Sequence, residues 1–270
     1  SNPTIETFFD EATNTATYLV IDPATKAAAI IDSVLDYDPR SGKVTTTSAD
    51  RLLAAIATKG LKVEWILETH AHADHLSAAQ YLKSHTGTPV GIGIHITEVR
   101  TIFDPVFDLE SRDGPEDEFD HHFRDGEHFT IGTIDVEVLA TPGHTPACIS
   151  YKIGDAIFVG DTLFMPDYGT ARADFPGGDA LTLYNSIQRL LALPDETRVF
   201  LCHDYKAPGR DHFVWETTIG EERRRNVHVH EGIGADEFVA MRNKRDATLA
   251  APTLLLPSIQ VNIHAGHLPQ

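Results

Sequence analysis

The segment THAHADH (residues 69–75) lies just beyond the apolar run 63–67. It places three imidazoles and one carboxylate within six positions, at His70, His72, Asp74 and His75. A short run rich in Val, Ile, Leu and Trp predicts a buried strand, whose end fixes the loop that follows. Imidazole nitrogens and carboxylate oxygens suit zinc, iron or manganese, and the lack of a nearby Cys argues against a closed thiolate site. The segment therefore predicts a catalytic metal site.

Further potential ligands stand at the ends of other predicted strands. They are His144 after the run 134–138, Asp161 after the run 156–159, and His203 after the run 199–201. A single His taken alone is commonly a hydrogen-bonded, partly buried side chain. Four groups of ligands, each at a strand end, are better explained by one metal centre.

The order HxHxDH, then His, Asp and His, resembles the metallo-β-lactamase superfamily over roughly residues 4–227. The resemblance implies an α/β fold of the αββα type. In this sandwich two mixed sheets lie face to face, helices flank them, and the metal lies at one end of the sheets. We expect a single domain over residues 3–270, with a C-terminal extension from about residue 247. Ser1 and Asn2 look like a remnant of expression.

Four segments narrow the resemblance. They are THAHADHLSAA (69–79), TPGHTPAC (141–148), GDTLFMPDYGTARADFPGGDA (160–180) and CHDY (202–205). Together they resemble the ETHE1-like persulfide dioxygenases, in their longer bacterial form. The resemblance implies one Fe(II) per chain and the oxidation of glutathione persulfide by O₂ to sulfite and glutathione. This reaction belongs to sulfide detoxification.

The resemblance also assigns the ligands. Iron would be held by His70, His144 and Asp161, and a triad of two His and one carboxylate leaves room for a substrate sulfur and O₂. The remaining candidates would support the triad or hold a second metal: His72, Asp74, His75 and His203. We therefore expect alanine at each triad position to abolish iron binding, and His72→Ala to leave much of it.

Two residues are candidates for catalysis and for binding the thiol substrate. The guanidinium of Arg172 can hold a substrate carboxylate through two parallel hydrogen bonds, or it can pair with Asp174. Tyr205 can donate its hydroxyl to the substrate, or it can serve only in packing.

A glyoxalase-II-like thioesterase is the main alternative. There Asp161 would bridge two metal ions, zinc or a mixed pair, and a bound hydroxide would attack an acyl-glutathione. All seven ligands are present for it. Against it, the region after His203 lacks the basic substrate-binding helices expected of that family. A catalytically silent binding protein is a weaker alternative, because no ligand is missing.

Composition limits the partners. The net charge of −18 disfavours nucleic acid and anionic membranes. Without a long apolar run or a leader segment, we expect a cytoplasmic protein. The two cysteines, Cys148 and Cys202, fit a reducing compartment as small core residues. Cys202 should face away from His203, because neighbouring residues of a strand alternate. The resemblance also implies a homodimer.

The remaining pattern predicts the following elements. Strands are expected at 6–9, 16–21, 27–31, 63–67 and 90–94, and helices at 50–59, 76–85, 97–103, 179–193, 217–225 and 236–245. Ser48 and Asp179 are the expected caps of two of these helices. The acid-rich tract 104–127, with His121 and His122, is predicted to be surface loop, and residues 254–267 an extended tail.

Overall fold

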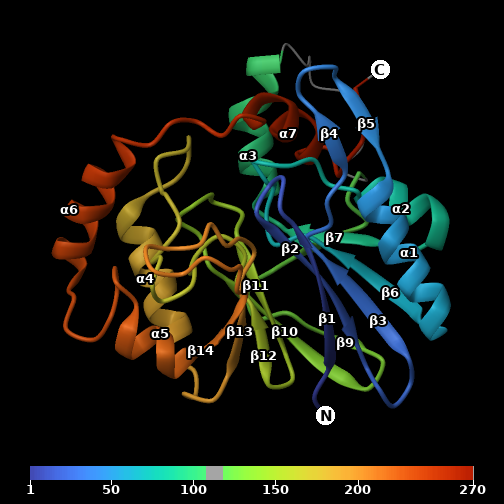
Figure 1. The fold of residues 1–270 in the computed structure, drawn as a ribbon, viewed down its shortest axis with the longest axis horizontal. Coiled ribbons are helices and arrows are strands. Elements are labelled where there is room, and N and C mark those ends of the chain that lie inside the picture. The colour runs from blue at the N-terminus through green and yellow to red at the C-terminus, as the bar shows by residue number, and fades with distance from the viewer. Residues whose placement is uncertain (108–117, 270) are drawn as a thin grey trace.

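Two six-stranded sheets lie face to face with helices on both outer sides (Figure 1). The computed structural model describes residues 1–107 and 118–269. The predicted αββα sandwich of two mixed sheets is confirmed. In the described part of the chain, every helix is too short or too polar to cross a bilayer.

The first sheet has the strand order β1-β2-β3-β6-β7-β8. Its strands are β1 (Thr4–Asp10), β2 (Thr15–Ile21), β3 (Ala27–Ile31), β6 (Lys62–Leu67), β7 (Val90–Gly93) and β8 (His121–Phe123). The first three pair antiparallel, and β3, β6, β7 and β8 run parallel. Parallel strands bring their carboxyl ends to one edge of a sheet, and at this edge the loop after β6 begins.

The second sheet has the order β14-β13-β12-β11-β10-β9. Its strands are β9 (His128–Ile131), β10 (Ile134–Ala140), β11 (Ile149–Ile153), β12 (Ala156–Phe158), β13 (Arg198–Phe200) and β14 (Glu216–Thr218). Only β12 and β13 pair parallel in this sheet, as far as the structure describes it. A small hairpin of β4 (Asp36–Asp38) and β5 (Lys43–Thr45) stands apart from both sheets.

The helices form two outer layers. Against the first sheet lie α1 (Thr47–Lys59), α2 (Ala79–Thr86), α3 (Ile96–Phe103) with the 3₁₀ turn η1 (Asp104–Phe107), and α7 (Leu255–Asn262). Against the second sheet lie α4 (Ala180–Leu191), α5 (Ile219–Arg225) and α6 (Ala235–Asp246). Figure 1 shows this division, with α4, α5 and α6 on one side and α1 and α2 on the other.

Because side chains alternate along each strand, the two sheets contribute to three apolar layers. One layer lies between the sheets, and one lies between each sheet and its helices. Along β2, Leu19 and Ile21 pack towards the helices of the first layer, whereas Tyr18 and Val20 pack between the sheets. Successive side chains of a strand point to opposite faces, so a strand buried on both faces must be apolar throughout. All seven residues of β2 are indeed buried. The strand ends, and the loops beyond them, are therefore held rigidly.

The predicted helices are present with adjusted ends. Asp179 caps α4 by accepting a hydrogen bond from the Thr182 N–H, as predicted. The predicted cap at Ser48 is wrong, because Ser48 lies inside α1. Its backbone N–H and hydroxyl both donate to Asp36, at 2.8 and 2.7 Å. The carboxylate of Asp36 thus satisfies the free end of α1 from twelve residues earlier.

Two predictions about irregular segments are wrong. Part of the acid-rich tract is a strand, β8, because Phe119 and Phe123 are buried and anchor it beside β7. Residues 108–117 of that tract lie outside the described residues. The predicted extended tail contains α7, which packs Ile259 and Val261 into the core of the first layer.

Candidate metal centre

All seven predicted ligands lie on loops at one end of the two sheets. The loop after β6 carries His70, His72, Asp74 and His75. His144 lies between β10 and β11, Asp161 follows β12, and His203 follows β13. The pairing of β3 with β6 and of β12 with β13 places the carboxyl ends of these parallel strands at the same end of the sandwich. The structure thus brings together every ligand that the sequence predicts.

The ligand atoms fall into two groups, within each of which all atoms lie within 4.8 Å of one another. One group, called the triad below, is His70, His144 and Asp161. The other, called the tetrad, is His72, Asp74, His75 and His203. Asp74 is half-buried, and the other six residues are buried. His72 therefore groups with the tetrad and not with the first His of its own motif.

The two groups meet at Asp161. Its Oδ2 lies 3.5 Å from His70 Nε2 and 3.3 Å from His144 Nε2, and its Oδ1 lies 3.2 Å from His203 Nε2. His203 Nε2 also lies 3.2 Å from Asp74 Oδ2. Despite these contacts, buried atoms of the centre lack a hydrogen-bond partner: His70 Nε2, His75 Nε2, His203 Nε2, Asp74 Oδ2 and Asp161 Oδ1. Buried nitrogen and oxygen atoms that converge without hydrogen bonds are suited to hold a cation.

The charges of the triad also suit a metal. Burial, with His72 nearby, lowers the pKa of His70 to about 4. Burial alone would raise the pKa of Asp161, but His203 and His70 hold it well below the usual value. Around neutral pH the triad thus offers a neutral His70 and an ionised Asp161. These are the protonation states in which the two groups bind a metal.

Outer contacts fix the imidazoles of the triad. His144 Nδ1 lies 2.8 Å from the carbonyl oxygen of Arg172, to which it can donate. His70 Nδ1 lies 2.9 Å from Thr69 Oγ1, and the same hydroxyl donates to Asp32 at 2.8 Å. In each case the second ring nitrogen is left for the metal, as is usual for metal-binding His.

His72 is held by two buried carboxylates that the sequence analysis did not find. Its Nε2 lies 3.0 Å from Asp32 Oδ1 and 3.2 Å from Glu68 Oε2. Burial opposes a charge on His72, yet Asp32 and Glu68 hold its pKa well above the usual value. The position of Asp32 just after β3 was a usable signal, since it matches the strand-end position of the ligands. Glu68 precedes the motif directly and looked like part of the loop.

Cys202 faces the centre, and the prediction that it faces away is wrong. Its Sγ lies 4.0 Å from His72 Nδ1. The strand β13 ends at Phe200, so the alternation of side chains no longer applies at Cys202 and His203. Burial, with Asp32 and Asp161 nearby, raises the pKa of this thiol well above the usual value. Cys202 is thus a protonated thiol beneath His72.

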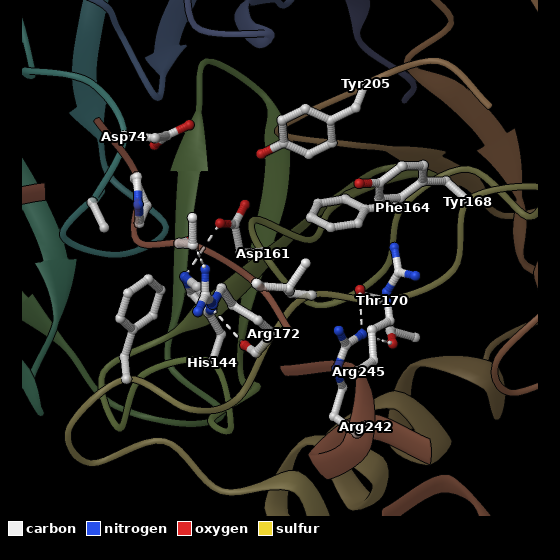
Figure 2. Close-up of a pocket in the computed structure, with 16 residues that line it drawn as sticks. Asp74, His144, Asp161, Phe164, Tyr168, Thr170, Arg172, Tyr205, Arg242 and Arg245 are labelled. Carbon is white, nitrogen blue, oxygen red and sulfur yellow. Dashed lines mark hydrogen bonds and ion pairs between the residues drawn. The ribbon is translucent and has the colours of Figure 1, made fainter. Parts of the chain in front are cut away.

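A pocket opens over the triad (Figure 2). His144, Asp161 and Asp74 form its floor, and rings of Phe164, Tyr168, Phe175 and Tyr205 form its walls. Figure 2 shows the hydroxyl of Tyr205 directed towards Asp161. Tyr205 as a whole is 40% exposed, but the surrounding pocket partly desolvates its phenol group. This desolvation, with Asp74 and Asp161, raises the pKa of the phenol well above the usual value.

Arg172 lines the pocket with its donors already engaged. Its Nε and Nη2 donate to Asp174 at 2.7 and 2.9 Å, and its Nη1 donates to the carbonyl of Ala250 at 2.7 Å. Of the two alternatives for Arg172, the ion pair with Asp174 is the one present in this structure.

Helix α6 supplies two further cations to the pocket, Arg242 and Arg245. Arg242 is buried and bound to Asp246 and to Thr170. Arg245 is exposed, and its guanidinium lies 5.9 Å from the ring centre of Tyr168. The sequence analysis found no basic substrate-binding helices after His203; α6 carries as many acids as bases, yet it places these two guanidinium groups at the pocket. The spacing Arg242 to Arg245 was a usable signal, since residues three apart share one helix face.

Comparisons with known proteins agree with this geometry. The model of the metallo-beta-lactamase superfamily matches residues 11–203. A probable metallo-hydrolase of Burkholderia pseudomallei is 50% identical, over 99% of this chain and 94% of the relative. Glyoxylase B2 of Dictyostelium discoideum is 50% identical, over 98% of this chain and 91% of the relative.

Some relatives are much longer than this chain. A beta-lactamase hydrolase-like protein of Xylella fastidiosa is 50% identical over 99% of this chain, which spans only 62% of that protein. Among solved structures, ETHE1 from Myxococcus xanthus is 33% identical with a TM-score of 0.78, and the match covers 98% of this chain and all of that one.

Proposed function

Since the chain belongs to the metallo-beta-lactamase superfamily, we propose that it is a mononuclear Fe(II) persulfide dioxygenase. The proposed reaction converts glutathione persulfide, O₂ and water to glutathione and sulfite. The oxygen atoms are transferred to the outer sulfur of the persulfide, and O₂ is the oxidant. The observation that carries this proposal is that His70, His144 and Asp161 converge as one group of ligand atoms, to which His72 does not belong.

The triad fits a single iron. Two imidazoles and one carboxylate on adjacent loops match the arrangement used by non-haem Fe(II) oxygenases, which leaves coordination positions open. A bound iron would supply the redox chemistry, whereas the protein supplies position and charge. In this proposal the tetrad supports the centre: the His203 ring contacts both Asp161 and Asp74, and His72 contacts Asp32 and Glu68.

The pocket has the features needed to bind a small anionic thiol. Its aromatic walls can enclose the tripeptide, and Arg245 offers a guanidinium for which the structure, in the residues it describes, gives no carboxylate partner within 4 Å. A guanidinium matches a carboxylate through two parallel hydrogen bonds. Arg245 is thus our first candidate for a substrate carboxylate. Arg172 can take this role only if it leaves Asp174.

Tyr205 remains a candidate for contact with the reacting end of the substrate. Its hydroxyl points into the pocket towards Asp161 (Figure 2). Because the pKa of this phenol is raised, the hydroxyl keeps its proton near neutral pH and can donate a hydrogen bond to a persulfide anion. The ring of Tyr168, 5.4 Å away, holds the ring of Tyr205 in place.

A dinuclear thioester hydrolase is the second candidate function. It is favoured by the tetrad, because His75, His203 and Asp74 also carry buried atoms without hydrogen-bond partners. The names of two relatives, metallo-hydrolase and glyoxylase, also support a hydrolase. Two metal ions sharing Asp161 would activate a water for attack on an acyl-glutathione.

The two functions are separated by their products. One preparation, purified without O₂, is given glutathione persulfide with O₂, and in parallel an acyl-glutathione. Sulfite formed together with O₂ uptake, and no thioester cleavage above the uncatalysed rate, is the expected result. Thioester cleavage without O₂ uptake would overturn the proposal and leave the hydrolase.

A further inference from the structure

Asn262, the last residue of α7, reaches the metal-binding loop from the far end of the chain. Its amide nitrogen donates to the carbonyl oxygens of His72 and His75, at 2.8 and 2.7 Å. Its amide oxygen accepts from the backbone N–H of Ser77 at 2.8 Å. Only 3% of Asn262 is exposed. One buried side chain thus binds three backbone groups of a loop that lies about 190 positions away.

This loop needs such a partner. Residues 68–78 form neither helix nor regular strand, so secondary structure pairs only a few of their backbone polar groups. Buried N–H and C=O groups without a partner are costly, and native proteins pair nearly all of them. In residues 1–107 and 118–269, no second hydrogen-bond partner is seen for the carbonyls of His72 and His75.

The segment that carries Asn262 is itself firmly held. Ile259 and Ile263 are buried in the same apolar cluster as Ala71 and Leu76 of the loop. Two residues beyond Asn262, the ring of His264 lies between the carboxylates of Glu118 and Asp104. Gly266 (φ +84°) then passes so close to the loop that an added Cβ would lie 3.0 Å from the Ser77 carbonyl oxygen. Asn262 is therefore presented to the loop in a fixed position.

Two buried side chains hold the loop, in addition to the backbone hydrogen bonds that Ile149 and Leu35 donate to the carbonyls of Thr69 and Leu76. At its start, the backbone N–H of Thr69 donates to Asp32 at 2.9 Å. At its turn, Asn262 holds the peptide groups of residues 72–77. Between these points lies His70 of the triad, and within the second lies Asp74 of the tetrad. Removing a ligand side chain leaves the contacts of Asp32 and Asn262 with the loop in place. Removing the Asn262 amide breaks the contacts with residues 72–77.

We propose that Asn262 is a positioning residue of the metal centre. From the C-terminal helix it fixes the turn of the HxHxDH loop, and so sets the direction in which His70 and the tetrad residues present their ligand atoms. The C-terminal segment is then part of the metal site. This inference concerns metal binding and does not depend on which reaction the centre performs.

The test is a Co(II) titration of the metal-free full-length chain, followed by visible absorption. Co(II) accepts nitrogen and oxygen ligands, and its spectrum reports their geometry. For Asn262→Ala we expect about a tenfold to hundredfold weaker affinity, the range found for residues that support metal ligands, together with an altered spectrum. The control is Ile259→Ala, which removes buried apolar contacts of the same helix without touching the amide contacts.

Ile259→Ala should lower the stability but keep the Co(II) affinity and spectrum. Unchanged affinity in Asn262→Ala, or an equal loss of affinity in Ile259→Ala, would overturn the proposal. If Asn262→Ala does not fold, Asn262→Ser keeps one donor and is compared in the same way. Because no turnover is measured, this outcome stays separate from that of the dioxygenase proposal.

Discussion

The carbonyl oxygen of Arg172 lies 2.8 Å from Nδ1 of His144, so a residue that lines the pocket also orients a predicted metal ligand through its backbone. The side chain of Arg172 meanwhile binds Asp174. The loop that carries Arg172 thus contacts both the pocket and the predicted metal centre. We therefore expect a change in the ion pair between Arg172 and Asp174 to alter metal affinity.

Arg172→Lys and Asp174→Asn should therefore have the same consequences. Each removes the bidentate pair, which is partly exposed and stabilises by about 1 kcal/mol at most. We expect a similar small loss of metal affinity in both variants and little change in KM. Metal content and persulfide kinetics measured side by side check this. A tenfold rise in KM in Arg172→Lys alone would show that Arg172 binds the substrate directly.

Arg245→Ala should raise the KM for glutathione persulfide by about tenfold and leave kcat nearly unchanged. A hydrogen bond to a charged group at an open site contributes on the order of 1.4 kcal/mol, which corresponds to that factor. Lys244→Ala is the matched control, since Lys244 is the exposed neighbour on α6 and does not line the pocket. Equal effects in both variants would mean that only the overall charge of the helix matters.

His144→Ala should lose iron, whereas His75→Ala should keep most of it, because only His144 belongs to the triad. Metal analysis after anaerobic loading checks this. His72→Ala, the comparison suggested by the sequence, is less suitable. It would leave Asp32 and Glu68 buried without their imidazole partner, at a cost of about 3–5 kcal/mol. Loss of iron in His75→Ala equal to that in His144→Ala would contradict the triad.

Stability should fall between about pH 6.5 and 4 because of His228. Burial, with Arg242 and Arg245 nearby, lowers its pKa from 6.5 to about 4, and its ring nitrogen accepts from the Thr170 N–H. The unfolded chain takes up this proton at a higher pH than the folded one, so acid favours unfolding in this window. Allowing for partial exposure, the loss is about 2 kcal/mol.

Urea unfolding of the metal-free chain at pH 4.5 and pH 7 measures that difference. His228→Asn lacks the titrating ring, so its stability should fall less over the same range. An identical fall in both proteins would rule out His228 as the source.

The seven ligands were predictable because their signals are local, and the sandwich was predictable because the order of these ligands resembles a known family. Apolar runs mark strands, and each ligand directly follows a run or lies in a short motif. Asn262 was not found, because its contacts lie about 190 positions away, whereas Asp32 and Glu68, 40 and 4 positions from His72, offered signals that the sequence analysis did not use. No pattern in the neighbouring sequence distinguishes a buried Asn that binds a distant loop from one at the surface.

The helix α7 was missed for a different reason. Pro257 stands in the first turn of α7, where a missing N–H breaks no helical hydrogen bond, so it is compatible with a helix that the sequence analysis did not predict. The strand β8 was hidden by the acids around it. In both segments, burial of a few apolar side chains outweighed the local composition.

The most direct measurement of the central claim combines metal content with O₂ consumption on one sample. The chain is purified without O₂ and loaded with Fe(II), its bound metal is counted, and glutathione persulfide is added in the presence of O₂. The account predicts about one iron per chain and one sulfite formed for each O₂ consumed. Two metal ions per chain, no O₂ consumption and cleavage of an acyl-glutathione would contradict it.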